Sequence, residues 1–343
     1  MAPVTNGRLL FKEIPTGYPV PGKTTVYDTS ETIDLESVSL RGGSLVKVLV
    51  LSSDPYLRGR MRDVTIPSYS SAFPIGKPLD NLGVGVVLRS EDPAFKAGDH
   101  VYGTLPFEQY TIQGRGARLR VLKNEVKIPW STYIGVCGMP GQTAYCAWKE
   151  YAFAKKGEVV FVTSGSGPVG ATVIQLAKAE GLKVIASAGS DEKVAFIRSI
   201  GADVAFNYKK ESTLEVLRKE GPIDIYWDNV GGETLEAAID TATVGARFLV
   251  CGCISEYNGQ PPYHVKNLNL IFAKELKISG FIIFNILAKY EEQFYAEIPK
   301  RVASGEIKYL EDVTRGLENA GQAILDVQKG LNKGKKVIVV AEA

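Results

Sequence analysis

The segment EVVFVTSGSGPVGATVIQLAKAEG, residues 158–181, decides the fold of the second half of the chain. It begins with Glu158–Thr163, a short apolar run with the length of a buried strand. It ends with Val169–Glu180, whose apolar residues have helical spacing, and Gly181 supplies a C-terminal stop. The segment therefore predicts a strand, a tight turn and a helix in direct succession.

Three glycines occupy the turn between this strand and this helix. Gly165, Gly167 and Gly170, with Pro168 and Val169, form the pattern G-x-G-x-x-G in the context in which it binds dinucleotides. Glycines let the backbone approach a pyrophosphate, and the helix N-terminus offers unpaired N–H groups and the positive end of its dipole. An ordinary tight turn is the alternative interpretation, but three glycines cost backbone entropy that such a turn does not require.

Strands and helices alternate along the rest of this part of the chain. Further strands are predicted at Lys183–Ser187, Val204–Phe206, Ile223–Asp228, Arg247–Cys251 and Lys277–Phe284, and a helix at Asp191–Ile200. Such alternation is typical of an α/β fold with a doubly wound parallel sheet.

The flanking regions have other patterns. Before about residue 127, β-like runs at Leu45–Leu51, Leu82–Leu88 and His100–Gly103 indicate an irregular β domain. Near the C-terminus, Tyr290–Ser304 predicts a helix that Pro299 should kink or break. An amphipathic segment at 316–329 and a strand at 335–340 follow.

Composition excludes several classes of function. The 343 residues favour two domains, and 45% hydrophobic residues are enough for two cores. A net charge of +2 gives no field that would attract nucleic acid or an anionic membrane, and the apolar runs are too short to span a bilayer. The N-terminus does not resemble a secretory signal, and four cysteines are too few for a disulfide scaffold, so we expect a cytoplasmic protein.

The end of the second α/β strand bears on the choice of cofactor. NAD-binding domains usually carry an acidic residue there for the ribose, whereas this chain has none before Ser190, which permits the 2′-phosphate of NADPH. Lys193 is a candidate ligand of that phosphate, although a solvated helix lysine is the alternative. Asp191 and Glu192 are predicted to complement the helix dipole, with ribose binding by one of them as the alternative.

Motifs along nearly the whole chain carry a family resemblance. They are DPYLRGRM (54–61), GMPGQTAY (138–145), the glycine turn, SDEK (190–193), FNY (206–208), DNVGG (228–232), CGCISEYN (251–258) and NKGK (332–335). In this order they resemble the zinc-independent medium-chain dehydrogenases/reductases. Within that group the chain is similar to NADP-dependent alkenal double-bond reductases and to leukotriene B4 12-hydroxydehydrogenase/prostaglandin reductases.

The resemblance implies an organisation and a partner. It implies a catalytic GroES-like β domain at 1–127, a Rossmann cofactor-binding domain at 128–298, and a segment at 299–343 that returns to the catalytic domain. It also implies a homodimer joined through the cofactor domains. The predicted strand Lys277–Phe284 is apolar enough to be an edge that pairs across a two-fold axis.

The resemblance also implies roles for particular residues toward NADP(H). The pyrophosphate would lie on Gly167, Pro168, Val169 and Gly170, and the 2′-phosphate on Lys193 and Tyr208. The ribose and nicotinamide would be lined by Met139, Asn229, Cys251, Ile254, Ser255, Tyr257, Phe281, Ile282, Ile283 and Asn332. Tyr56 and Tyr257 would face the substrate.

The chemistry must proceed without a metal if these patterns hold. The chain has two histidines, and no cysteine precedes Cys137, so the three-ligand set of a catalytic zinc is not expected. Cys251 and Cys253 are better explained as small buried hydrophobes than as ligands. Arg58 and Arg60 are predicted to form structural ion pairs rather than to contact substrate.

A metal-free site must stabilise developing negative charge by hydrogen bonding. We therefore predict hydride addition to the β-carbon of an α,β-unsaturated aldehyde or ketone, with the enolate stabilised by Tyr257, the ribose 2′-hydroxyl, or both. Packing roles are the alternatives for Tyr257 and Tyr56. Quinone reduction, oxidation of a lipid-mediator hydroxyl, and a non-enzymatic cofactor-binding scaffold are the alternative functions.

Overall fold

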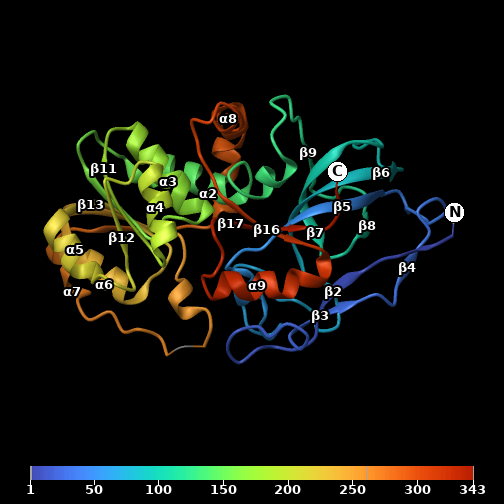
Figure 1. Cartoon of the computed structure of the whole chain (residues 1–343), viewed down its shortest axis with the longest axis horizontal. Coiled ribbons are helices and arrows are strands. Elements are labelled where there is room, and N and C mark those ends of the chain that lie inside the picture. Colours follow the sequence, from blue (N-terminus) through green and yellow to red (C-terminus); the bar gives the residue numbers. More distant parts are fainter. Residues whose placement is uncertain (1, 260, 343) are drawn as a thin grey trace. The chain divides into compact units, whose positions relative to one another are not determined.

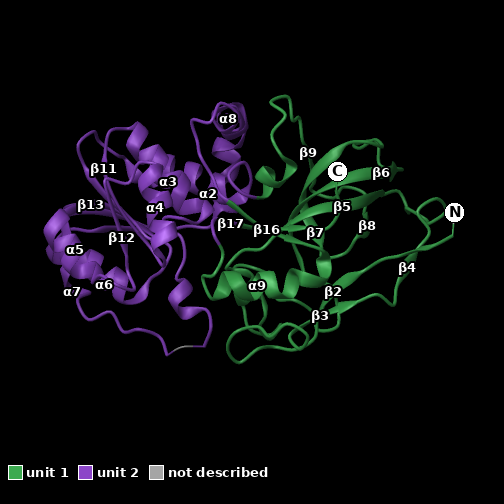
Figure 2. Ribbon diagram, viewed as in Figure 1, with its two compact units in different colours: residues 1–134, 311–332, 336–343 green, residues 135–310, 333–335 purple. Residues whose placement is uncertain are grey.

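The computed structural model describes residues 2–259 and 261–342. The chain forms two compact units (Figure 2). Unit 1 contains residues 1–134, 311–332 and 336–343, and unit 2 contains residues 135–310 and 333–335. The sequence predicts divisions at 127 and 298, somewhat earlier in the chain than those of the compact units.

Unit 2 is built on a parallel sheet of six strands within the described residues (Figure 1). Along the sheet the strands are β12 (Val204–Asn207), β11 (Lys183–Ala188), β10 (Val159–Val162), β13 (Ile223–Asp228), β14 (Ala242–Val250) and β15 (Lys277–Gly280). Numbered by their order in the chain, this is 3-2-1-4-5-6, the strand order of a dinucleotide-binding Rossmann fold. The predicted doubly wound α/β fold is therefore confirmed.

Helices precede, connect and follow these strands. They are α2 (Met139–Ala147), α3 (Pro168–Ala179), α4 (Asp191–Ser199), α5 (Thr213–Glu220), α6 (Gly232–Thr241), α7 (Asn269–Ala273) and α8 (Ile283–Ala303). The core includes Phe161, Tyr226 and Phe248, one from each of three strands, and each side chain is fully buried. Parallel strands bury both faces, which explains why they appear in the sequence as continuous apolar runs.

Of two predictions for the end of this unit, the strand bounds are wrong and the break at Pro299 does not occur. The strand predicted at Lys277–Phe284 ends at Gly280, because the apolar residues from Ile283 onward take helical spacing and begin α8. Helix α8 does not break at Pro299 but continues to Ala303. Pro299 lies among the buried residues Phe294, Ile298 and Val302, and this packed face compensates for the hydrogen bond that proline removes.

Unit 1 is an irregular β structure. Its main sheet contains β16 (Glu311–Arg315), β17 (Lys335–Val339), β5 (Ser44–Ser52), β6 (Asp80–Ser90), β7 (His100–Pro106) and β9 (Arg120–Val121), with β8 (Tyr110–Gln113) paired to β5. Smaller pairs join β2 (Arg8–Phe11) to β3 (Thr25–Asp28) and β1 (Val4–Thr5) to β4 (Thr32–Ile33). Helices α1 (Leu57–Arg60) and α9 (Ala320–Gln328) supply residues to its core, as Leu57 and Ile324 do. The C-terminal strand β17 pairs with β5, so the two ends of the chain build one sheet.

Within residues 2–259 and 261–342, no helix has the length and hydrophobicity needed to cross a membrane.

Candidate functional site

The glycine turn lies between β10 and the first residue of α3, as predicted. Gly167 is the N-cap of α3 and Pro168 is its first residue. A Cβ atom added to Gly170 would lie 2.5 Å from the carbonyl oxygen of Ser164, so no side chain fits there without a backbone shift. At Gly165 the added Cβ would lie 3.1 Å from Ile174, which is tight packing between α3 and the sheet. The turn thus brings the helix N-terminus close to the strand end, a geometry that fits a bound pyrophosphate.

The residues predicted to bind the 2′-phosphate, Lys193 and Tyr208, lie at the turn after β11. Ser190 caps α4 by accepting a hydrogen bond from the Lys193 backbone N–H at 3.3 Å. Tyr208, directly after β12, is 52% exposed, and its hydroxyl would lie 3.0 Å from a Cβ on Gly189. The Lys209 ammonium lies 6.0 Å from the centre of the Tyr208 ring. The structure therefore brings Lys193 and Tyr208 to the same turn.

Both acidic residues after this turn are occupied by other side chains. Asp191 accepts hydrogen bonds from the Asn207 amide at 2.9 Å and the Lys210 ammonium at 2.5 Å. Glu192 pairs with Lys333 at 2.7 Å. Both lie in the first turn of α4, where they complement the helix dipole as predicted.

Asn229 forms hydrogen bonds that join the ends of the two central strands, β10 and β13. Its side-chain amide donates to the carbonyl of Thr163 at 2.7 Å, and its side-chain oxygen accepts from the Trp227 indole at 3.2 Å. The Asn229 N–H donates to the Thr163 hydroxyl at 2.8 Å. Since Thr163 directly precedes the glycine turn, Asn229 fixes the relation between that turn and the end of β13.

Asp228 organises the same region and was missed by the sequence analysis as a functional candidate. One carboxylate oxygen of this fully buried residue accepts from the Tyr226 hydroxyl, the Val230 N–H and the Gly231 N–H at 2.8–2.9 Å. Its backbone carbonyl accepts from the N–H groups of Cys251 and Gly252. Burial raises the pKa of the Asp228 carboxyl, against the effect of these N–H donors. The signal that was available is an acid ending an apolar strand immediately before Asn-Val-Gly-Gly.

The segment after β14, which contains Tyr257, is hydrogen-bonded to the residues that follow β13. The Ile254 N–H donates to the Asn229 carbonyl at 3.3 Å, and the Ser255 hydroxyl donates to the Val230 carbonyl at 2.6 Å. The Tyr257 hydroxyl accepts from the Cys253 N–H at 3.4 Å and would lie 3.1 Å from a Cβ on Gly252. A continuous series of contacts therefore runs from the glycine turn through Thr163 and Asn229 to Tyr257.

The two cysteines of this segment are protonated thiols at neutral pH. Burial, followed by the nearby Asp228 carboxylate, raises the pKa of Cys251 to about 12 and that of Cys253 to about 11. This environment agrees with the interpretation that both are small hydrophobes. Among the described residues no group of three or more His, Cys, Asp and Glu side chains is arranged to hold a metal ion.

The remaining predicted cofactor residues have distinct positions. Half-buried Met139 begins α2, and its carbonyl accepts from the Thr143 hydroxyl at 2.7 Å. Phe281 follows β15 and packs edge-on against Trp227 with ring centres 5.9 Å apart, while Ile282 and Ile283 lead into α8. Asn332 belongs to unit 1, unlike the other predicted cofactor residues.

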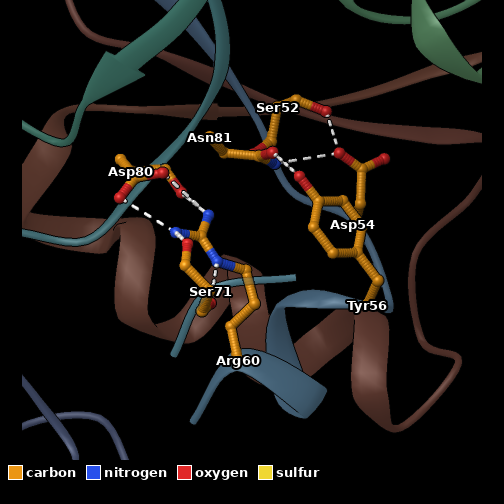
Figure 3. Close-up of polar contacts among 7 residues, drawn as sticks. All are labelled: Ser52, Asp54, Tyr56, Arg60, Ser71, Asp80 and Asn81. Carbon is orange, nitrogen blue, oxygen red and sulfur yellow. Dashed lines mark hydrogen bonds and ion pairs between the residues drawn. The ribbon is translucent and has the colours of Figure 1, made fainter. Parts of the chain in front are cut away.

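Tyr56 lies in unit 1 within a buried polar network (Figure 3). Its hydroxyl donates to the side-chain oxygen of Asn81, whose amide donates to Asp54 at 2.9 Å and to the carbonyl of Ser52 at 2.7 Å. Burial, with the charge of Asp54, raises the pKa of Tyr56 well above its usual value. The proton of Tyr56 is thus committed to Asn81, a geometry that favours the packing alternative for this hydroxyl.

The two arginines near Tyr56 have structural partners. Arg60 pairs with both carboxylate oxygens of Asp80 at 2.7 and 3.0 Å (Figure 3), which agrees with the predicted ion pair. Arg58 instead donates to the backbone carbonyls of Gly17 and Pro15 at 2.9 and 3.0 Å, so its predicted ion pair is replaced by hydrogen bonds to the main chain.

Comparison with known proteins adds an independent finding. Residues 168–300 match a family model described as zinc-binding dehydrogenase, and residues 8–121 match one described as the N-terminal domain of oxidoreductase. The chain is 40% identical to the NADP-dependent 2-alkenal reductase of Nicotiana tabacum, over 98% of each chain. It is also 40% identical to (+)-pulegone reductase of Mentha piperita, over 88% of each. The crystal structure of CurA from Vibrio vulnificus in complex with NADPH is similar with a TM-score of 0.88 and 31% identity, covering 98% of this chain and 100% of that one.

Proposed function

Because this chain belongs to the medium-chain dehydrogenases/reductases, among the NADP-dependent alkenal double-bond reductases, we propose that it reduces the carbon–carbon double bond of α,β-unsaturated aldehydes and ketones. It is an NADP-dependent reductase, and NADP(H) is its cofactor. The proposal of substrate class is supported by relatives named for a 2-alkenal and for pulegone. The observation that carries it in the structure is the series of contacts linking the glycine turn to the hydroxyl of Tyr257.

The bound cofactor would supply a hydride to the β-carbon of the substrate, and a proton taken up at the α-carbon would complete the saturated carbonyl. We propose that Gly167, Pro168, Val169 and Gly170 hold the pyrophosphate through the N-terminus of α3. Gly170 keeps the helix against the strand, since a side chain there would meet the Ser164 carbonyl.

The protein's contribution to the chemical step is the stabilisation of charge. As hydride reaches the β-carbon, negative charge moves to the carbonyl oxygen, and a hydrogen-bond donor aimed at that oxygen lowers the barrier. We propose Tyr257 as this donor, alone or together with the ribose 2′-hydroxyl. The carbonyls of Asn229 and Val230 hold its segment at Ile254 and Ser255, which limits the reorganisation that the donor needs during the reaction.

Tyr56 has a different proposed role. Its O–H is donated to Asn81, so we propose that only its ring faces the substrate. We further propose that Asn229, Met139, Asn332 and the segments around Cys251–Ser255 and Phe281–Ile283 line the ribose and nicotinamide. The Asn229 side chain also has a structural role, because its amide group binds Thr163 and Trp227.

We expect NADPH to be consumed with enals and enones and the products to be the saturated carbonyls. The measurement is a panel of enals, enones and quinones with NADPH, with products identified by mass. Protein dialysed against a chelator should be equally active, because we expect no metal to take part. Consumption of NADPH with quinones alone would refute the proposed substrate class.

Replacement of Lys193 by Ala should weaken NADPH binding by about 1–3 kcal/mol, the range for a charge-assisted hydrogen bond, and leave NADH nearly unaffected. The reason is that only NADPH carries the 2′-phosphate. Dissociation constants for both cofactors are the appropriate measurement. Equal losses for NADPH and NADH would rule out Lys193 as the phosphate ligand.

We propose that the chain forms a homodimer through β15. This strand ends the parallel sheet, and Ile278 on it is 42% exposed. Light scattering should give twice the chain mass, and Ile278→Lys should shift the protein to monomer because an edge lysine opposes strand pairing. Val313→Lys, at a similarly exposed position on β16 in unit 1, is the matched control and should leave the mass unchanged. A monomeric wild-type protein would contradict the proposal.

A further inference from the structure

The first turn of α4 carries two carboxylates, and each is paired with a lysine from a distant segment. Lys210, beyond β12, contacts Asp191 with its ammonium 2.5 Å from the carboxylate. Lys333, near the C-terminus, contacts Glu192 at 2.7 Å. Both lysines belong to unit 2, as α4 does.

Stability does not account for these two pairs. Their side chains are 59–70% exposed, and ion pairs at such exposure contribute little to folding. Hydrogen bonds from Lys210 and Asn207 lower the pKa of Asp191, so its carboxylate is charged at neutral pH. Without the lysines, only the helix dipole and the hydrogen bond from Asn207 would offset the two negative charges at the start of α4 among the contacts described above.

The position of these charges matters for the cofactor. Lys193 belongs to the same helical turn, and Tyr208 lies against Gly189, one residue before the Ser190 cap. A 2′-phosphate bound by Lys193 and Tyr208 would carry close to two negative charges beside Asp191 and Glu192. The negative charges of the phosphate and of a neighbouring carboxylate repel each other unless a cation neutralises one of them.

We propose that Lys210 and Lys333 determine the preference for NADPH over NADH by neutralising Asp191 and Glu192. They act on the phosphate through the carboxylates and are therefore positioning residues rather than phosphate ligands. The inference rests on the proposed function in one respect, the location of the 2′-phosphate at Lys193 and Tyr208.

The test is direct binding of NADPH and NADH, followed by nicotinamide fluorescence at low ionic strength and again at high salt. Lys210→Met should weaken NADPH about threefold to tenfold and change NADH less than about twofold, with the difference shrinking at high salt. Lys333→Met should act in the same direction. Lys219→Met, which removes an 81% exposed lysine at the end of α5, is the matched control and should alter neither cofactor.

A second variant separates neutralisation from direct contact. Adding Asp191→Asn to Lys210→Met removes the charge that Lys210 would balance, so NADPH affinity should return to within about twofold of wild type. If the double variant stays as weak as Lys210→Met, Lys210 binds the phosphate itself and the inference is overturned. Equal weakening of NADPH and NADH by Lys210→Met would overturn it as well.

Turnover of an enone at saturating NADPH distinguishes this inference from the proposed function. Loss of the cofactor preference with enone reduction intact supports the inference and leaves the function standing. A protein that reduces no enone but shows the predicted binding pattern would refute the proposed substrate class while supporting the role of the lysines.

Discussion

Replacement of Arg60 by Met should lower the free energy of unfolding by about 2–3 kcal/mol, somewhat below the cost of breaking a fully buried ion pair. Arg60 is 6% exposed, and its guanidinium donates to both carboxylate oxygens of Asp80 (Figure 3). It also donates to the backbone carbonyls of Asp80 and Ser71. Its guanidinium also lies 4.0 Å from the centre of the Phe73 ring. The expected loss is reduced because the Asp80 side chain is 33% exposed and recovers part of its hydration.

The measurement is the free energy of unfolding in urea, obtained from a global fit to the unfolding curves of two probes. The matched control is Arg315→Met, which breaks an ion pair with Glu342 whose partners are 69% and 83% exposed, and which should change stability by less than about 0.5 kcal/mol. Adding Asp80→Leu to Arg60→Met should recover part of the loss, since no uncompensated charge then remains. Losses that simply add in the double variant would show that the two side chains are not coupled.

The α/β unit could be predicted from the sequence because its signals are local. The central strands are largely apolar runs, and two of the helices between strands begin at a serine cap, Ser190 for α4 and Ser212 for α5. The strand at Ile223–Asp228 was predicted with the bounds that the structure has. The prediction of a strand at Lys277–Phe284 was wrong at its end, because an apolar run does not show where the two-residue spacing of a strand gives way to the spacing of a helix.

Ion pairs between residues far apart in the chain could not be predicted from the sequence. Arg60 was predicted to form an ion pair, but nothing local identifies Asp80, 20 residues later in the chain, as its partner. The same holds for Lys333 and Glu192, which lie far apart in the chain. A residue's type indicates the charge that it needs nearby, whereas only the fold decides which partner supplies it. The sequence therefore supplies candidate residues for the site, which stay predictions, but it does not supply their hydrogen-bond partners.

Replacement of Tyr257 by Phe should lower turnover with an enone about tenfold to a hundredfold while NADPH affinity stays nearly constant. The change keeps the ring and removes only the hydroxyl. An interaction that strengthens as charge develops on the carbonyl oxygen appears in the rate rather than in ground-state binding. The expected loss is smaller than for some oxyanion donors because the ribose 2′-hydroxyl shares the task in our proposal.

The contacts that hold the backbone of the Tyr257 segment do not involve the hydroxyl that this variant removes, which makes the experiment interpretable. The Tyr257 hydroxyl accepts a long hydrogen bond from the Cys253 N–H at 3.4 Å, whereas the backbone of its segment is held separately through Ile254 and Ser255. Tyr263→Phe removes a hydroxyl that accepts from Lys266 at 3.2 Å in the segment that follows, and serves as the matched control with unchanged turnover. If Tyr257→Phe instead loses NADPH affinity and keeps its turnover, Tyr257 packs against the cofactor and is not the donor. The product of both variants must be the saturated carbonyl, because an allylic alcohol would mean that hydride reaches the carbonyl carbon and that no enolate forms for Tyr257 to stabilise.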